Sequence, residues 1–163
     1  MGIDHRESGR LGKAVEHLVA ATCILTSDLS LNVSTSFVDD EGVDLVFARR
    51  GEQKTLAVQV KSRRISGTSM ARGTFRAQVS ESTFTPRDDL HMLYVAVDPA
   101  EGTFDLAWLV PSKVLQTRSK VNPQGRRRFV ASVSPTSNDQ WSKFRCSRKE
   151  LAGHILDAID ALP

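Results

Sequence analysis

The stretch VDLVFARRGEQKTLAVQVK, residues 43–61, decides the fold. Residues 43–48 are nearly all apolar, as is typical of a strand buried on both faces. Residues 55–61 alternate between apolar and other side chains, which predicts a second strand. The connection between them is short and contains Gly51, so the sequence predicts an antiparallel hairpin.

The polar residues of this hairpin are expected on one face. If Gly51 and Glu52 form the turn, counting outward along both strands puts Asp44 opposite Gln59. Opposed residues point to the same face of a sheet, and strand alternation puts Lys61 on that face too. These groups supply oxygen ligands for a hard divalent cation and a positive charge beside them. The alternative is that Asp44 caps a turn and that Lys61 marks where the strand reaches solvent.

The rest of the chain predicts helices at both ends and strands between them. Residues 4–24 have apolar side chains at helical spacing, and so do the residues behind Ser147 and Glu150, which have the spacing of a capping box. This order favours an α/β or α+β fold with a mixed sheet and flanking helices. Further strands are expected at 29–38, 74–80, 92–97, 104–110 and 129–133, with a short helix at 111–116.

Length and composition are those of an ordinary folded domain. The chain has 163 residues, 40% hydrophobic and 25% charged, and we expect one domain spanning residues 1–163. Its net charge of +3 permits an anionic partner without requiring one. No apolar run approaches the ~20 residues that a membrane span needs, and no secretory signal is visible. We therefore expect a cytoplasmic protein with no membrane partner.

Three segments carry a resemblance to a known family: Gly12–Glu16, Glu41–Val46 and Val58–Ser62. In this order and spacing they resemble the PD-(D/E)XK nuclease superfamily, which includes type II restriction enzymes and archaeal Holliday-junction resolvases. The resemblance covers about the first 65 residues directly. It implies a restriction-endonuclease-like fold, DNA as the partner and Mg²⁺ (or Mn²⁺) as the cofactor.

The family pattern implies a role for each matching position. Asp44 corresponds to the metal-binding aspartate, Gln59 to the second acidic position and Lys61 to the lysine. Val60 would add its carbonyl oxygen to the metal. Glu16 corresponds to the helix glutamate that reaches the metal through water, although its place beside the apolar stripe is equally typical of a solvated surface residue.

The sequence departs from the pattern at two positions. Val43 stands where many members have proline, and Gln59 replaces an acidic residue. The second change removes a negative charge and is expected to weaken metal binding. The sequence thus favours a metal-dependent endonuclease that hydrolyses DNA phosphodiester bonds. The alternatives are an impaired nuclease-fold module that binds DNA or a protein partner, and an unrelated α+β scaffold if Asp44 and Lys61 do not converge.

Basic residues follow the candidate site along the chain. We expect them to flank one DNA-binding groove, although runs of charge are more often plain solvated surface. A homodimer is also consistent with this function, because a double-strand cut needs two sites and a symmetric pair of chains supplies them. The predicted DNA-binding residues are Arg63, Arg64, Arg76, Arg126, Arg127 and Arg128.

Overall fold

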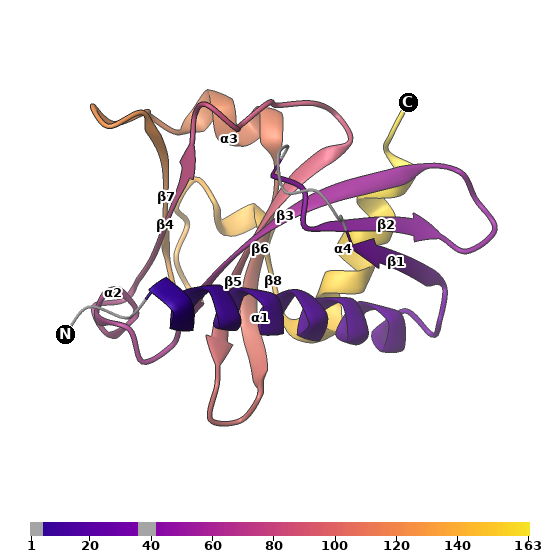
Figure 1. Cartoon of the computed structure of the whole chain (residues 1–163), viewed down its shortest axis with the longest axis horizontal. Coiled ribbons are helices and arrows are strands. Elements are labelled where there is room, and N and C mark those ends of the chain that lie inside the picture. The colour runs from indigo at the N-terminus through magenta and orange to yellow at the C-terminus, as the bar shows by residue number, and fades with distance from the viewer. Residues whose placement is uncertain (1–4, 36–41) are drawn as a thin grey trace.

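A computed structural model describes residues 5–35 and 42–163 (Figure 1). Asp4, the end of the predicted strand 29–38 and Glu41 lie outside the described residues. The elements are α1 (His5–Thr26), β1 (Leu31–Thr35), β2 (Leu45–Arg49), β3 (Thr55–Arg64), α2 (Thr68–Ala71), β4 (Thr74–Ser80), β5 (Leu90–Asp98), β6 (Thr103–Pro111), α3 (Ser112–Arg118), β7 (Arg126–Ser132), the 3₁₀ turn η1 (Ser142–Phe144), β8 (Arg145–Cys146) and α4 (Arg148–Asp160).

The centre of the molecule is a six-stranded sheet in the order β1-β2-β3-β5-β6-β8. Its neighbouring strands are antiparallel except β3 and β5, which are parallel, so the sheet is mixed. The connection from β3 to β5 contains α2 and β4. The predicted α/β class, with a mixed central sheet flanked by helices, is confirmed.

Helices α1 and α4 pack on one face of this sheet. Val15 and Val19 of α1 share a buried cluster with Leu151 and Ile155 of α4 and with the apolar residues of β2 and β3. The predicted capping box begins α4: the Ser147 hydroxyl accepts the backbone N–H of the helix's third residue, whose carboxylate accepts the Ser147 N–H. No helix within the described ranges is long and apolar enough to cross a membrane.

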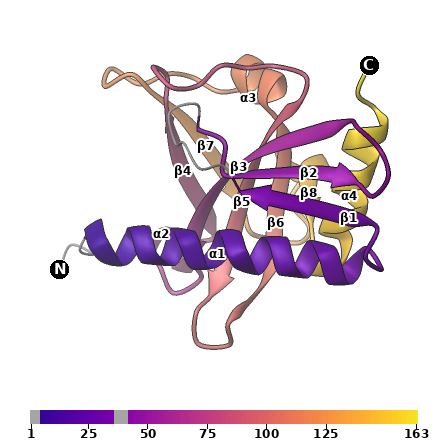
Figure 2. The ribbon, with the colours of Figure 1, turned by 45° about the vertical axis from the view of Figure 1, so that its right-hand side comes forward.

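The other face of the sheet is covered by a two-stranded antiparallel sheet, β4 and β7, which we call the ribbon, together with α3. Phe75 and Phe129 of the ribbon pack on Tyr94 and Trp108 of the main sheet. The rings of Tyr94 and Phe129 are stacked at 3.7 Å. In Figures 1 and 2 the ribbon lies at the side of the molecule away from α4.

Candidate active site

The β2–β3 hairpin has the predicted register. Its pairs run from Leu45 opposite Val58 to Ala48 opposite Thr55, which is the register expected from a turn at Gly51. This pairing brings the residue just before β2 alongside the middle of β3, and the candidate site is built there.

Asp44 lies at the point where the chain enters β2, and it is bound to β3 in two ways. Its backbone N–H donates to the Val58 carbonyl at 3.0 Å, and its carboxylate oxygen Oδ2 accepts the Val60 N–H at 2.7 Å. A carboxylate that accepts a backbone N–H is held in one orientation by the strand itself. Asp44 is therefore a fixed group of the sheet and does not simply cap a turn.

One pocket of about 650 Å³ collects all the residues predicted for catalysis and metal binding. Its lining includes Glu16, Asp44, Gln59, Val60 and Lys61. The remaining walls come from the first half of α1, the end of β3, α2 with the residue before it, and Arg76 of β4. Asp44 and Lys61 thus converge, as the hairpin register requires.

Glycine at position 42 is a part of this site that the sequence analysis did not identify. Gly42 has φ +67, and a Cβ there would lie 2.9 Å from Nε2 of Gln59. The left-handed backbone favours glycine, and a Cβ at this position would displace the end of the Gln59 side chain. A glycine two residues before Asp44 was the signal that could have pointed to it.

Glu16 lies on α1 and is 8% exposed, so the interpretation of this residue as solvated surface is wrong. Its carboxylate forms an ion pair of 2.9 Å with the ammonium of Lys13, one turn earlier and largely exposed. Glu16 lines the pocket together with other residues from the first half of α1.

Four of the predicted cationic residues line the same pocket: Lys61, Arg63, Arg64 and Arg76. Within residues 5–35 and 42–163, no salt bridge involves any of them. The pocket thus combines the carboxylates of Asp44 and Glu16 with a cationic rim, which is the distribution that a phosphodiester next to a bound cation requires.

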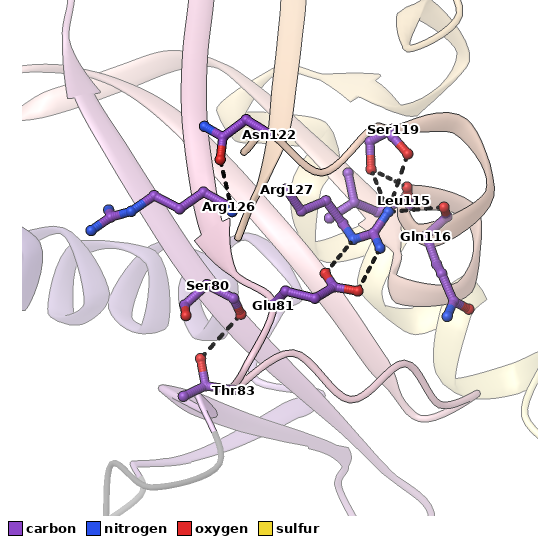
Figure 3. Close-up of polar contacts among 9 residues, drawn as sticks. All are labelled: Ser80, Glu81, Thr83, Leu115, Gln116, Ser119, Asn122, Arg126 and Arg127. Carbon is purple, nitrogen blue, oxygen red and sulfur yellow. Dashed lines mark hydrogen bonds and ion pairs between the residues drawn. The ribbon is translucent and has the colours of Figure 1, made fainter. Parts of the chain in front are cut away.

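None of the three arginines of the run Arg126–Arg128 lines this pocket. Arg127 is buried, and its guanidinium donates to both carboxylate oxygens of Glu81 at 3.0 and 2.8 Å (Figure 3). It also donates to the carbonyls of Gln116 and Ser119 at the end of α3. These acceptors occupy its donors, so Arg127 does not flank the predicted groove. Its two neighbours in the run are exposed.

The donors at the pocket suit a hard divalent cation. The Asp44 carboxylate, the Gln59 amide oxygen and the Val60 carbonyl are all oxygen ligands, as Mg²⁺ and Mn²⁺ prefer. Among the residues that the structure describes, no three His, Cys, Asp or Glu side chains gather as a metal cluster. A cation at this site would therefore depend on amide and backbone oxygens beside the carboxylates.

Comparison with known proteins gives a structural match and no sequence match. No family model matches the chain, and no curated protein matches it. The structure of a bacterial homing endonuclease, I-Ssp6803I, is similar with a TM-score of 0.60. The two are 15% identical over 98% of this chain and 96% of that chain. At this identity the likeness shows a shared fold, which extends over nearly the whole of both chains.

Proposed function

We propose that this chain is a metal-dependent endonuclease of the PD-(D/E)XK type that hydrolyses phosphodiester bonds in DNA. The observation that carries the proposal is the convergence of Asp44, Gln59, Val60 and Lys61, with Glu16, around one pocket. The fold shared with a homing endonuclease supports it.

Asp44, Gln59 and Val60 would hold Mg²⁺ or Mn²⁺ through their side-chain and carbonyl oxygens. The ion would supply Lewis-acid stabilisation of the negative charge that develops on the phosphate. Lys61 orients the attacking water and offsets the same developing charge. The attacking water gives up a proton to solvent as its oxygen forms a new bond to phosphorus, one ester P–O bond breaks, and the departing oxygen takes up a proton from solvent. Glu16 orients water at the α1 side of the pocket.

The cationic rim of the pocket would hold the DNA backbone. Arg63, Arg64 and Arg76 are side chains of the kind that bind phosphate oxygens, and such contacts release condensed counterions. DNA affinity should then fall steeply as salt rises.

A second candidate function is favoured by Gln59. An amide oxygen carries no net charge, so it binds a hard cation less strongly than a carboxylate does. In this alternative the chain keeps the nuclease fold and binds DNA or a protein partner without cutting.

A plasmid cleavage assay with Mg²⁺ or Mn²⁺ tests the proposal. Asp44→Asn should lose both cleavage and metal binding, because it removes the anionic ligand held against β3. Lys61→Ala should keep metal binding but cut about 10²-fold more slowly, the effect of losing one charge-stabilising donor. Asp105→Asn and Lys149→Ala, which change exposed residues outside the pocket, are the matched controls. Cleavage by Asp44→Asn at the wild-type rate would show that the site is wrongly assigned.

Gln59→Glu separates the two candidate functions. The added carboxylate should tighten Mg²⁺ binding, measured by calorimetric titration. If the chain is a working nuclease, wild type and variant both cut, and the variant does so at lower metal concentration. If the site is impaired, wild type does not cut although it binds DNA.

A homodimer would supply the two sites that a double-strand cut requires. Light scattering of the protein on DNA should then give the mass of two chains, whereas a monomer would be restricted to nicking.

A further inference from the structure

The ribbon has two chemically different faces. Its pairing places Arg76 opposite Val130, Gln78 opposite Arg128, and Ser80 opposite Arg126. These side chains are exposed, whereas the alternate positions of both strands, such as Phe75 and Phe129, are buried against the main sheet. Only the outer face can therefore contact another molecule.

The outer face is cationic and continuous with the candidate active site. Strands β4 and β7 contain no Asp or Glu, and three arginines alternate onto this face: Arg76, Arg126 and Arg128. Arg76 also lines the pocket, so the pocket and the ribbon share one basic surface. Among the described residues, no carboxylate forms a salt bridge with any of these arginines.

The buried Arg127 positions its neighbours. Because successive strand residues point to opposite faces, turning Arg127 inward onto Glu81 turns Arg126 and Arg128 outward. The same guanidinium holds the end of α3 through the carbonyls of Gln116 and Ser119 (Figure 3). The far end of the ribbon is thus held in a fixed orientation relative to the main sheet.

We propose that the outer face of the ribbon lies in the major groove of double-stranded DNA that is cut at the pocket, an inference that rests on the proposed function. A major groove ~12 Å wide admits a two-stranded β-ribbon, and it presents a distinct hydrogen-bonding pattern for each base pair, whereas the pattern in the minor groove, ~6 Å wide, is degenerate. In the middle of the ribbon Gln78 and Arg128 face the same side, and their side chains match the hydrogen-bonding edges of adenine and guanine. Arg76 and Arg126, nearer the ends, contact phosphates.

Binding without cleavage tests the ribbon separately from the chemistry. A fluorescent 40-base-pair duplex of mixed sequence and its single strand are titrated in EDTA at several salt concentrations. Wild type should prefer the duplex. Arg126→Ala should lower the slope of log affinity against log salt by about 0.9, and Arg128→Ala should weaken binding roughly tenfold. Arg50→Ala is the matched control, because this exposed arginine lies in the β2–β3 turn at the other end of the molecule (Figure 1).

Groove-specific ligands and sequence selection test the position of the ribbon. Methyl green, which occupies the major groove, should displace the protein, and distamycin, which occupies the minor groove, should not. Selection from a random duplex pool should show a base preference that Gln78→Ala loses at one position, with the salt slope unchanged. Displacement by distamycin alone would overturn the proposal.

The outcomes separate the two proposals. Suppose that wild type cuts and binds duplex DNA, and that Arg126→Ala and Arg128→Ala bind the duplex with the same affinity and salt dependence as wild type. The ribbon inference is then wrong and the proposed function stands. If wild type binds duplex but cuts nothing, the nuclease proposal fails while the ribbon variants still decide where the duplex binds. If wild type neither binds nor cuts DNA, both are wrong.

Discussion

At the scale of single residues, the site depends on how closely the backbone at Gly42 approaches the Gln59 side chain. Gly42→Ala adds a Cβ in a left-handed conformation and within 2.9 Å of the amide nitrogen, so the amide must move. We expect a loss of about 1 kcal/mol in unfolding free energy from backbone strain. Metal affinity and cleavage should fall as well, because Gln59 no longer faces Asp44 in the same position.

Gly51→Ala is the matched control for this prediction. Gly51 has φ +84, and a Cβ added at this position would have no heavy atom near it. The Gly51→Ala substitution therefore introduces similar backbone strain without the clash. Chemical denaturation should show comparable destabilisation of the two variants, and calorimetric titration should show weakened metal binding in Gly42→Ala alone. Equal metal binding by both variants would mean that Gln59 is not a ligand or that its position is not critical.

At the scale of elements, Arg127 joins the ribbon to α3. Its side chain is 7% exposed, while that of Glu81 is 40% exposed. Arg127→Met leaves the Glu81 carboxylate and the α3 carbonyls without their donor, and we expect a loss of about 2–4 kcal/mol in unfolding free energy. Glu81→Gln should lose only about 1 kcal/mol, because its remaining oxygen still accepts from Arg127 and its exposure to solvent weakens the charge contribution.

Urea denaturation measures this difference. Arg128→Met, on the same strand but exposed, is the control and should change stability by less than about 0.5 kcal/mol. If Arg127→Met and Arg128→Met were equally stable, the contacts of Arg127 would not hold the ribbon to α3.

At the scale of the whole molecule, burial of His91 couples stability to pH. His91 lies on β5 with its Nδ1 buried and unpartnered among the described residues, and desolvation lowers its pKa from 6.5 to about 4. In the unfolded chain this histidine takes up a proton below about pH 6.5, whereas the folded protein does not until about pH 4. Stability should therefore fall as the pH drops from 6.5 towards 4.

His91→Phe removes this dependence. Between pH 7 and pH 4.5 the wild type should lose up to about 2 kcal/mol more unfolding free energy than the variant, measured by urea denaturation at both pH values. His17→Phe, which changes an exposed histidine, should behave as wild type. The small pocket beside His91 is also lined by Lys143, His154 and Asp157. Lys143→Met therefore measures how much a neighbouring positive charge contributes to the pH dependence of stability.

The local sequence was sufficient to predict the hairpin and the convergence of the residues at the centre of the candidate site. Turn length sets the register, and period-two alternation decides which side chains share a face, so Asp44, Gln59 and Lys61 could be placed together without knowing the rest of the fold. The capping box that begins α4 was predictable for the same reason, because its partners are three residues apart.

Only the tertiary structure decided what lies against these local elements. Three features depend on contacts between segments that are distant in sequence. They are the parallel pairing of β3 with β5, the burial of Glu16 and the approach of Gly42 to Gln59. The predicted last strand began at Phe129, whereas β7 begins three residues earlier, at Arg126. The alternation therefore runs through the arginines and turns Arg127 inward. The sequence by itself determined which side chains alternate on each strand; which face becomes interior was decided by the elements that cover it, because burial is a property of the packed molecule.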